Sequence, residues 1–88
     1  MEKGKIVVVD DEKIVTSAFA TLLKVEGFSD AHFFNNPKDA LEFLKENTPD
    51  LVISDFLMPE MNGLEFLSKV KETYPEVSKI LLTGYADK

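Results

Sequence analysis

Blocks of apolar residues alternate with helix-like segments along the chain and predict a repeating strand–helix pattern. Four short apolar runs have the character of strands, at residues 5–10, 31–34, 51–54 and 79–82. The first is an unbroken series of Val and Ile, which indicates a strand covered on both faces, as in a parallel sheet between helix layers. Between these runs, apolar residues recur at the three- and four-residue spacing of amphipathic helices.

Two helices are predicted in the first half of the chain. The first spans residues 12–26 and stops at Gly27. The second begins at Asn36-Pro37, where Asn can cap the helix and Pro is tolerated at its first position, and it ends before Pro49. The predicted buried face of the first helix is unusually wide and is formed by Ile14, Ala18, Leu22 and Val25, with Val15, Phe19 and Leu23 beside them.

A third helix opens at Asn62-Gly63, because Asn62 can cap it and Glu65 stands three residues later, as in a capping box. It closes at Tyr74-Pro75. Its predicted apolar face consists of Leu64, Leu67 and Val70, with Phe66 adjacent.

The order β-α-β-α-β-α-β requires right-handed crossovers and predicts an α/β fold with a mainly parallel sheet. If the strands are arranged 2-1-3-4, the topology reverses between the first and third strands. Ligands of such sheets bind beyond the carboxyl ends of the strands at that reversal.

Acidic residues follow those two strands. Asp10 and Asp11 end the first, and Asp55 ends the third. Two unit charges ~4 Å apart cost roughly 4 kcal/mol at an effective dielectric of about 20, so three converging carboxylates call for a cation. Oxygen ligands without His or Cys favour Mg²⁺, which shares its coordination shell with phosphate. Asp55 stands alone at its strand end and is the candidate nucleophile toward phosphorus.

Some of these polar residues also have interpretations that involve no ligand. Asp11 or Glu12 alone could merely begin a helix, an interpretation that the set of three aspartates makes less favourable. His32 lies on a predicted strand and is interpreted as a packed or surface residue. Thr83-Gly84, after the fourth strand, adds a hydroxyl group where a phosphoryl oxygen could approach, which on its own is weak support.

Composition limits the remaining function classes. The 88-residue chain is one small domain with a net charge of −6 and no cluster of Lys or Arg, which argues against binding of nucleic acid or an anionic membrane. It has no cysteine for a disulfide or thiolate site. No secretory signal or membrane-spanning run is present, so a cytoplasmic location is expected.

With these residues placed, the chain closely resembles the receiver domain of bacterial two-component response regulators. The matching motifs are residues 7–12 (VVVDDE), residues 50–55 (DLVISD) with Met58-Pro59 and Asn62-Gly63 beyond them, and residues 80–86 (ILLTGYA). The resemblance implies a flavodoxin-like, doubly wound parallel sheet. Many family members have Asp-Gly where Asn62-Gly63 stands.

The resemblance also implies the roles of the site residues. Asp55 would accept a phosphoryl group from a sensor histidine kinase or a phosphotransfer protein, and Asp10, Asp11, Asp55 and the backbone carbonyl of Leu57 would bind Mg²⁺. Thr83 would supply the switch hydroxyl. The domain would not be an enzyme, beyond self-catalysed transfer to Asp55 and slow loss of the phosphoryl group.

One departure from the family is large. Residues 1–88 match a receiver domain without its fifth strand, its last two helices and the lysine that contacts the phosphoryl group, and with no linker or effector domain. We therefore expect an incomplete domain whose exposed apolar surfaces form a homodimer or higher oligomer. The alternative is an inactive receiver fragment or assembly module that keeps the fold and the metal site without phosphorylation-dependent signalling.

Overall fold

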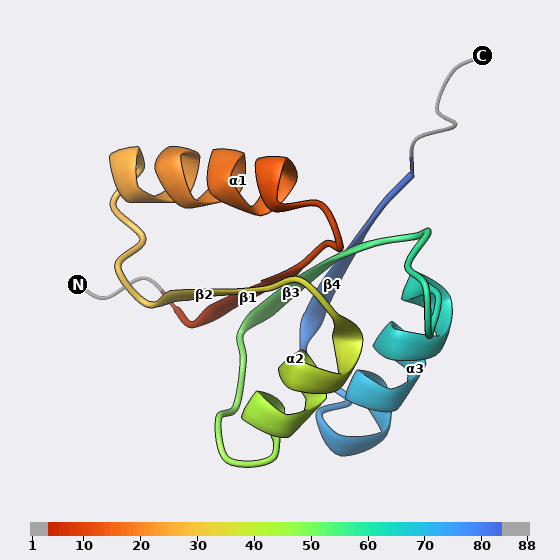
Figure 1. Ribbon diagram of the computed structural model, residues 1–88. Helices are drawn as coiled ribbons and strands as arrows, with labels where there is room; N and C mark the ends of the chain where they lie inside the picture. The colour runs from red at the N-terminus through yellow and green to blue at the C-terminus, as the bar shows by residue number, and fades with distance from the viewer. Residues whose placement is uncertain (1–3, 84–88) are drawn as a thin grey trace.

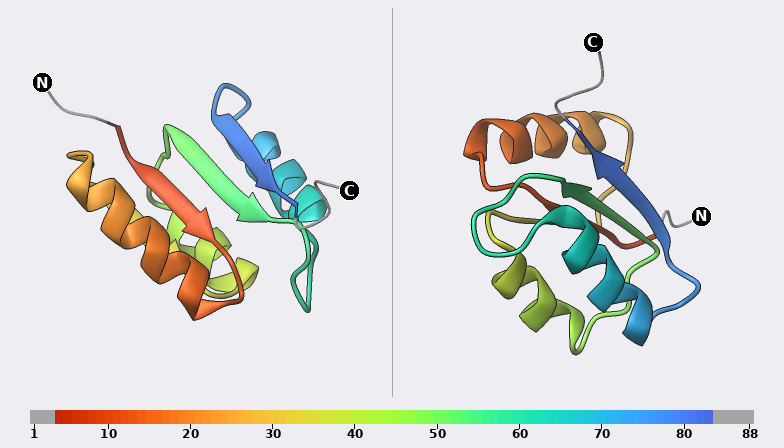
Figure 2. Two further views of the ribbon diagram at one scale, coloured as in Figure 1. Left: turned by 90° about the horizontal axis from the view of Figure 1, so that it is seen from above. Right: turned by 90° about the vertical axis from the view of Figure 1, so that its right-hand side faces the viewer.

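The computed structural model describes residues 4–83 and shows a parallel sheet between two helix layers (Figure 1). The strands and helices are β1 Ile6–Val9, α1 Lys13–Val25, β2 Ala31–Phe34, α2 Pro37–Leu44, β3 Leu51–Asp55, α3 Gly63–Thr73 and β4 Ser78–Leu82. The strand order is β2-β1-β3-β4, which confirms the predicted topology. Helix α1 covers one face of the sheet, and α2 and α3 cover the other (Figure 2).

The register of the sheet brings the carboxyl ends of all four strands to one edge. Val9 of β1 is the partner of both Phe34 and Ser54, and Asp55 is the partner of Leu82. The loops that follow the four strands therefore begin side by side. This edge is the one at which the sequence predicted a ligand site.

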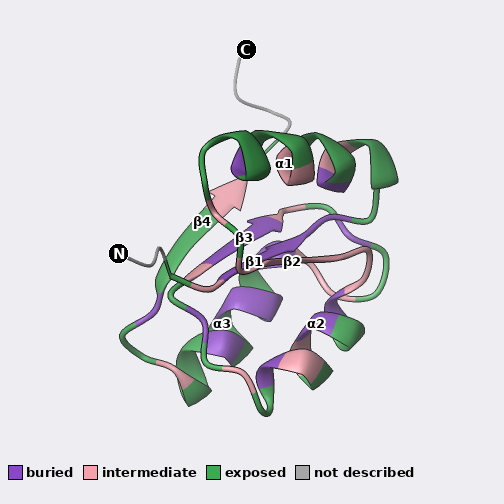
Figure 3. Ribbon diagram, turned by 90° about the vertical axis from the view of Figure 1, so that its left-hand side faces the viewer, coloured by how far each residue is buried: buried purple, intermediate pink, exposed green. Residues whose placement is uncertain are grey.

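Alternate residues of the strands pack into two separate cores, as expected for strands buried on both sides. The core under α2 and α3 is the larger, and its buried members are Val7, Val9, Ala40, Leu44, Val52, Met58, Phe66, Leu67, Val70 and Val77. The core under α1 has four buried members, Ile6, Val8, Leu23 and Ile53. Figure 3 shows β1 and β3 as the most deeply buried part of the molecule.

The predicted caps of α2 and α3 are confirmed. The Asn36 side chain accepts a hydrogen bond from the Asp39 amide at 2.9 Å. Asn62 and Glu65 form a reciprocal capping box, with hydrogen bonds of 2.9 and 3.1 Å. These local interactions satisfy amide groups that a helix N-terminus otherwise leaves without partners.

The predicted buried face of α1 is wrong in part. Ile14, Leu22 and Val25 are 83%, 53% and 75% exposed, and Ala18 is exposed as well. Of the residues predicted beside that face, Leu23 is buried and Phe19 is partly buried, and Thr16 is buried on the same side of the helix. Its apolar arc is wider than the contact surface, because the helix lies over β1 and β2 alone. The sequence pattern could not show which part of that arc meets the sheet.

The predicted face of α3 needs a smaller correction. Leu64 is 57% exposed, whereas Phe66, which was placed beside the face, is fully buried. Leu67 and Val70 are buried as predicted. The large ring of Phe66 removes more apolar surface from water than Leu64 could, so the helix is rotated to bury it.

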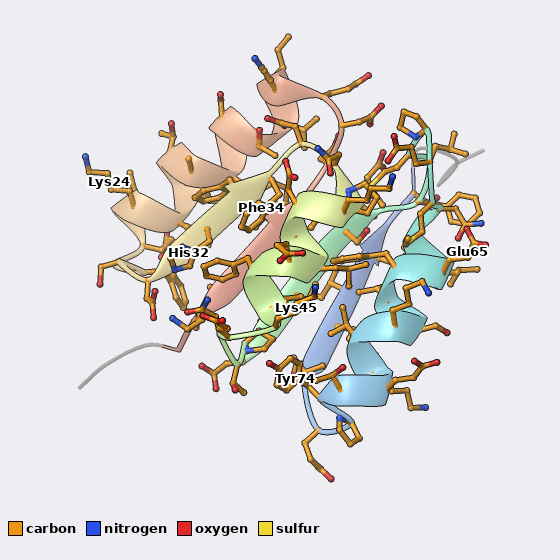
Figure 4. All side chains as sticks on the ribbon, turned by 60° about the horizontal axis from the view of Figure 1, so that its bottom comes forward. Lys24, His32, Phe34, Lys45, Glu65 and Tyr74 are labelled. Atoms are coloured by element: carbon orange, nitrogen blue, oxygen red, sulfur yellow. The ribbon has the colours of Figure 1, made fainter. Side chains whose placement is uncertain are left out.

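His32, interpreted as a packed or surface residue, is half-buried on β2 (Figure 4). Its ring lies 4.6 Å from the ring of Phe43 on α2, and Phe43 in turn lies 5.3 Å from Phe34. One ring nitrogen of His32 is 2.7 Å from Asp30, which Lys5 also contacts at 3.0 Å. The hydrogen bonds from His32 and then Lys5 hold the pKa of Asp30 below its usual value.

Helix length also bears on membrane association. Within residues 4–83, no helix is long and apolar enough to span a bilayer.

Candidate functional site

Three aspartates meet at the carboxyl edge of the sheet, as the sequence predicted. Each of Asp10, Asp11 and Asp55 offers a carboxylate oxygen, and these three oxygens lie within 4.8 Å of one another. They differ in exposure, because Asp10 is buried, Asp55 is half-buried and Asp11 is exposed. The cluster forms because β1 and β3 are hydrogen-bonded neighbours that end at the same level.

Asp10 is the most firmly held of the three. Its carboxylate accepts a hydrogen bond from the Glu12 amide at 2.9 Å, which closes the turn that leads into α1. Its own amide donates to the carbonyl of Phe34 at 3.0 Å, and its carbonyl accepts from the Asn35 side chain at 2.9 Å. Asn35 was missed by the sequence analysis, since an Asn directly after a strand is common in loops and gave no specific signal.

Asp55 is positioned by the sheet and by the loop that follows it. The amide of the next residue, Phe56, donates to the carbonyl of Leu82 at 2.9 Å. The carbonyl of Phe56 accepts from the Gly63 amide at 2.8 Å, which draws the start of α3 against the end of β3. A Cβ atom on residue 63 would clash with the Asp55 carbonyl and would lie 2.6 Å from the Leu81 side chain. Only glycine fits this approach.

Burial and mutual repulsion disfavour the ionised forms of the two inner carboxylates. Burial is the main reason that the pKa of Asp10 is raised, the Glu12 amide opposes it, and the charges of Asp55 and Asp11 add to it. Burial likewise raises the pKa of Asp55, partly offset by the Phe56 amide, and Asp11 and Glu12 raise it further. Among residues 4–83, no lysine forms an ion pair with these three carboxylates.

A hard divalent cation would relieve this repulsion. The donor set contains only carboxylate oxygens, which suits Mg²⁺, and Asp11 is exposed while Asp55 is only half-buried, so the ion could keep several waters. The residues present therefore fit a magnesium ion.

The two remaining predicted site residues lie at the same edge of the sheet. Leu57 is in the loop after β3 and is 53% exposed, and Thr83 directly follows β4. Their roles as a carbonyl ligand and as a switch hydroxyl stay predictions. Gly84, Tyr85 and Ala86 of the last motif lie outside the described residues.

The sequence model of the family described as "Response regulator receiver domain" matches residues 6–88, nearly the whole chain. The chain belongs to this family. The predicted resemblance is therefore confirmed, and so is the flavodoxin-like fold of the receiver domain.

Individual proteins are also similar to this chain in sequence and in structure. The chain is 34% identical over 87 residues to the DNA-binding transcriptional regulator NtrC of Proteus hauseri, covering 99% of this chain and 18% of that protein. A crystal structure of an uncharacterized protein from Neptuniibacter caesariensis has a TM-score of 0.90 and 40% identity, covering 98% of this chain and 63% of the other.

A CheY-like response regulator receiver domain protein from Methanospirillum hungatei JF-1 has a TM-score of 0.89 and 28% identity, over 99% of this chain and 68% of the other. The receiver domain described here thus spans about a fifth of the NtrC relatives and about two thirds of these solved chains.

Proposed function

We propose that this receiver domain accepts a phosphoryl group on Asp55 in two-component signal transduction. The donor would be the phosphohistidine of a sensor histidine kinase or of a phosphotransfer protein. Mg²⁺ would be held by Asp10, Asp11, Asp55 and the backbone carbonyl of Leu57. The observation that carries the proposal is the convergence of three carboxylates within 4.8 Å at the strand ends. The domain would be the phosphorylation site itself and not an enzyme that acts on a separate substrate.

The chemistry of Asp55 follows from its surroundings. An Asp55 carboxylate oxygen would attack phosphorus and form a new O–P bond, while the P–N bond of the phosphohistidine breaks and the imidazole leaves with the electron pair. Bound Mg²⁺ would supply neutralisation of the charge on the transferring group. Without a cation, burial and the neighbouring acids raise the pKa of Asp55, and a bound cation would favour the ionised form that attacks phosphorus.

The surrounding chain would hold the metal ligands and the phosphoryl group in place. Asp10 is fixed through its amide, its carbonyl and its carboxylate, so its ligand oxygen loses little freedom on binding a cation. Thr83 follows the strand that pairs with Asp55, and its hydroxyl would donate to a phosphoryl oxygen. We place this activity in the cytoplasm, which holds the ATP from which a sensor kinase forms its phosphohistidine.

The deciding test is the intact mass of the chain after incubation with a small acyl phosphate. With Mg²⁺ present we expect a gain of one phosphoryl group, and with excess EDTA we expect none. Hydroxylamine should remove the group, because it cleaves an acyl phosphate and leaves phosphoserine and phosphothreonine intact. Peptide mass mapping should place the group on the segment that contains Asp55.

An unmodified mass in the presence of Mg²⁺, from a sample with a folded circular-dichroism spectrum, would contradict phosphorylation. It would favour the alternative, an inactive receiver or assembly module. One observation supports an assembly role in its own right. Helix α1 exposes Ile14, Leu22 and Val25 to solvent, and Ile80 on β4 is 45% exposed on the same side of the sheet as α1.

We propose that these residues bury one another in a dimer or higher oligomer, since exposed apolar surface favours association. Light scattering at concentrations on the order of tens of micromolar should give a mass above that of one chain. Leu22→Lys with Val25→Lys should shift the chain toward monomer. Ser68→Lys, at an exposed position on α3, should leave the mass unchanged. A parent chain that is monomeric at these concentrations would rule the association out.

A further inference from the structure

The side chain of Asn35 joins three segments of the chain directly behind the acidic cluster. Asn35 directly follows β2, and its amide nitrogen donates to the main-chain carbonyl of Asp10 at 2.9 Å and to the hydroxyl of Thr16 at 3.1 Å. Thr16, in the first turn of α1, is 6% exposed, and its hydroxyl donates to the Lys13 carbonyl at 3.2 Å. One amide group thus connects the end of β1, the start of α1 and the loop after β2.

These contacts fix the peptide unit between Asp10 and Asp11. The Asp10 amide is held by the Phe34 carbonyl, and the Asp10 carbonyl is held by Asn35, the residue after Phe34. Because the peptide group is planar, holding the Asp10 carbonyl also fixes the amide of Asp11 and the direction in which Asp11 leaves the strand. Asp11 is exposed and has no neighbouring strand to orient it. Its carboxylate therefore depends on this peptide unit for its place beside Asp55.

Asparagine suits this position because both hydrogen bonds leave from one nitrogen. The NH₂ group supplies two donors, one for the Asp10 carbonyl and one for the Thr16 hydroxyl, which is already donating to Lys13. Aspartate would present only acceptors when ionised, and serine only one donor. Neither could make both contacts.

We propose that Asn35 is a positioning residue for the cation site, acting through the main chain of Asp10 and the hydroxyl of Thr16. This inference rests on the proposed function, in which Asp10, Asp11 and Asp55 hold Mg²⁺. Partners that orient metal ligands typically account for about 10- to 100-fold in metal affinity. The Asn35→Ala chain should therefore bind Mg²⁺ about tenfold more weakly than the parent chain, or weaker still. Its fold should persist, since Asn35 is half-buried and water can reach the groups that it leaves.

The neighbouring Asn36 provides a matched control. Its side chain caps α2 through the Asp39 amide and donates to the Asp39 carboxylate at 3.0 Å, and neither of these contacts is with the acidic cluster. Asn36→Ala should lower the folding equilibrium constant about fivefold, as loss of a helix cap does. It should leave Mg²⁺ affinity unchanged. The two adjacent substitutions thus separate positioning of the site from general stability.

The test is a Mg²⁺ titration followed by NMR shifts of the Glu12 and Phe56 amides, at a temperature where every variant is folded. We expect weaker binding for Asn35→Ala and parent-like binding for Asn36→Ala. Thr16→Val should weaken binding, whereas Thr16→Ser, which keeps the hydroxyl, should restore it. Equal affinities for the parent and Asn35→Ala would overturn the inference, as would an equal loss in Asn36→Ala.

Asp11→Asn distinguishes failure of the inference from failure of the proposed function. If Asp11→Asn loses Mg²⁺ affinity while Asn35→Ala does not, the metal site stands and the role of Asn35 is wrong. If the parent chain shows no Mg²⁺-dependent shifts, or if Asp11→Asn binds as the parent does, the proposed metal site is wrong and the inference fails with it.

Discussion

The Asp55→Asn chain is expected to gain no phosphoryl group under conditions that phosphorylate the parent, and yet to be more stable than the parent in metal-free buffer. Asparagine has no nucleophilic carboxylate, so the acceptor is lost. It also removes one of three converging negative charges. A pair of unit charges ~4 Å apart costs between about 1 and 4 kcal/mol, depending on whether the effective dielectric is near 80 or near 20. We expect a stability gain in that range at pH 7.

The pH dependence of this gain has a definite sign. Because the pKa values of Asp10 and Asp55 are raised above 3.8, the folded chain binds protons more tightly than the unfolded chain does. The resulting penalty is absent at pH values below 3.8 and grows as the pH rises through the raised pKa values. The advantage of Asp55→Asn should therefore appear above pH 3.8, reach its full size near neutral pH, and vanish on acidification.

Urea midpoints measured in EDTA over a series of pH values check this expectation. Asp39→Asn removes the same charge from the first turn of α2, where a negative group is favourable, and should not stabilise the chain. Saturating Mg²⁺ should shrink or reverse the advantage of Asp55→Asn, since a ligand at about a hundredfold excess over its Kd adds about 2.7 kcal/mol to the stability of the parent. A less stable Asp55→Asn chain in EDTA at pH 7 would show that charge repulsion does not strain the site.

Gly63→Ala is expected to destabilise the chain by about 1–3 kcal/mol, a typical cost of overpacking. It should also weaken Mg²⁺ binding. The added Cβ would collide with the Asp55 carbonyl, which is rigid main chain at the end of β3, and would lie 2.6 Å from the Leu81 side chain. This clash can be removed only if α3 or β3 moves, and either movement displaces Asp55. Helix propensity alone predicts the opposite sign, since Ala is favoured over Gly in a helix by about 1 kcal/mol.

Gly4→Ala is the matched control for this substitution. A Cβ on residue 4 would meet the side chain of Asp50, 2.6 Å from its Cγ atom, at the opposite edge of the sheet. That side chain can rotate away, at the expense of its 2.7 Å hydrogen bond with the Lys5 amide. We expect a smaller loss in the urea midpoint and no change in Mg²⁺ affinity. If Gly63→Ala is as stable as the parent, the close approach of α3 to β3 is not required.

The fold and the acidic cluster were predictable from sequence because their signals are local. Asn36 and Asn62 cap their helices through amides three residues away, so both starts could be seen in short windows. The first and third strands lead into aspartates, and parallel pairing brings those two ends together wherever the strand order is 2-1-3-4. Asp10, Asp11 and Asp55 could thus be placed in one site.

The features that were missed depend on contacts between distant segments. The role of Asn35 arises from β1, α1 and the loop after β2 together, and no pattern around Asn35 shows this. The apolar arc of α1 offered several faces, and the position of the helix over β1 and β2 selected the one with Leu23. Packing of Phe66 over Leu64 was likewise decided by the space beneath α3.

The uneven cover of the sheet implies a gradient of local stability across it. Strand β1 pairs on both sides, and all four of its residues are buried, whereas β4 pairs with β3 alone among the described residues and its first three residues are exposed. Local opening of β4 should therefore cost less free energy than local opening of β1. Opening would break the hydrogen bond between Leu82 and Phe56, next to Asp55. Any group that holds the acidic site closed would then suppress amide hydrogen exchange in β4, so occupancy of the site and the fluctuations of this strand are thermodynamically linked.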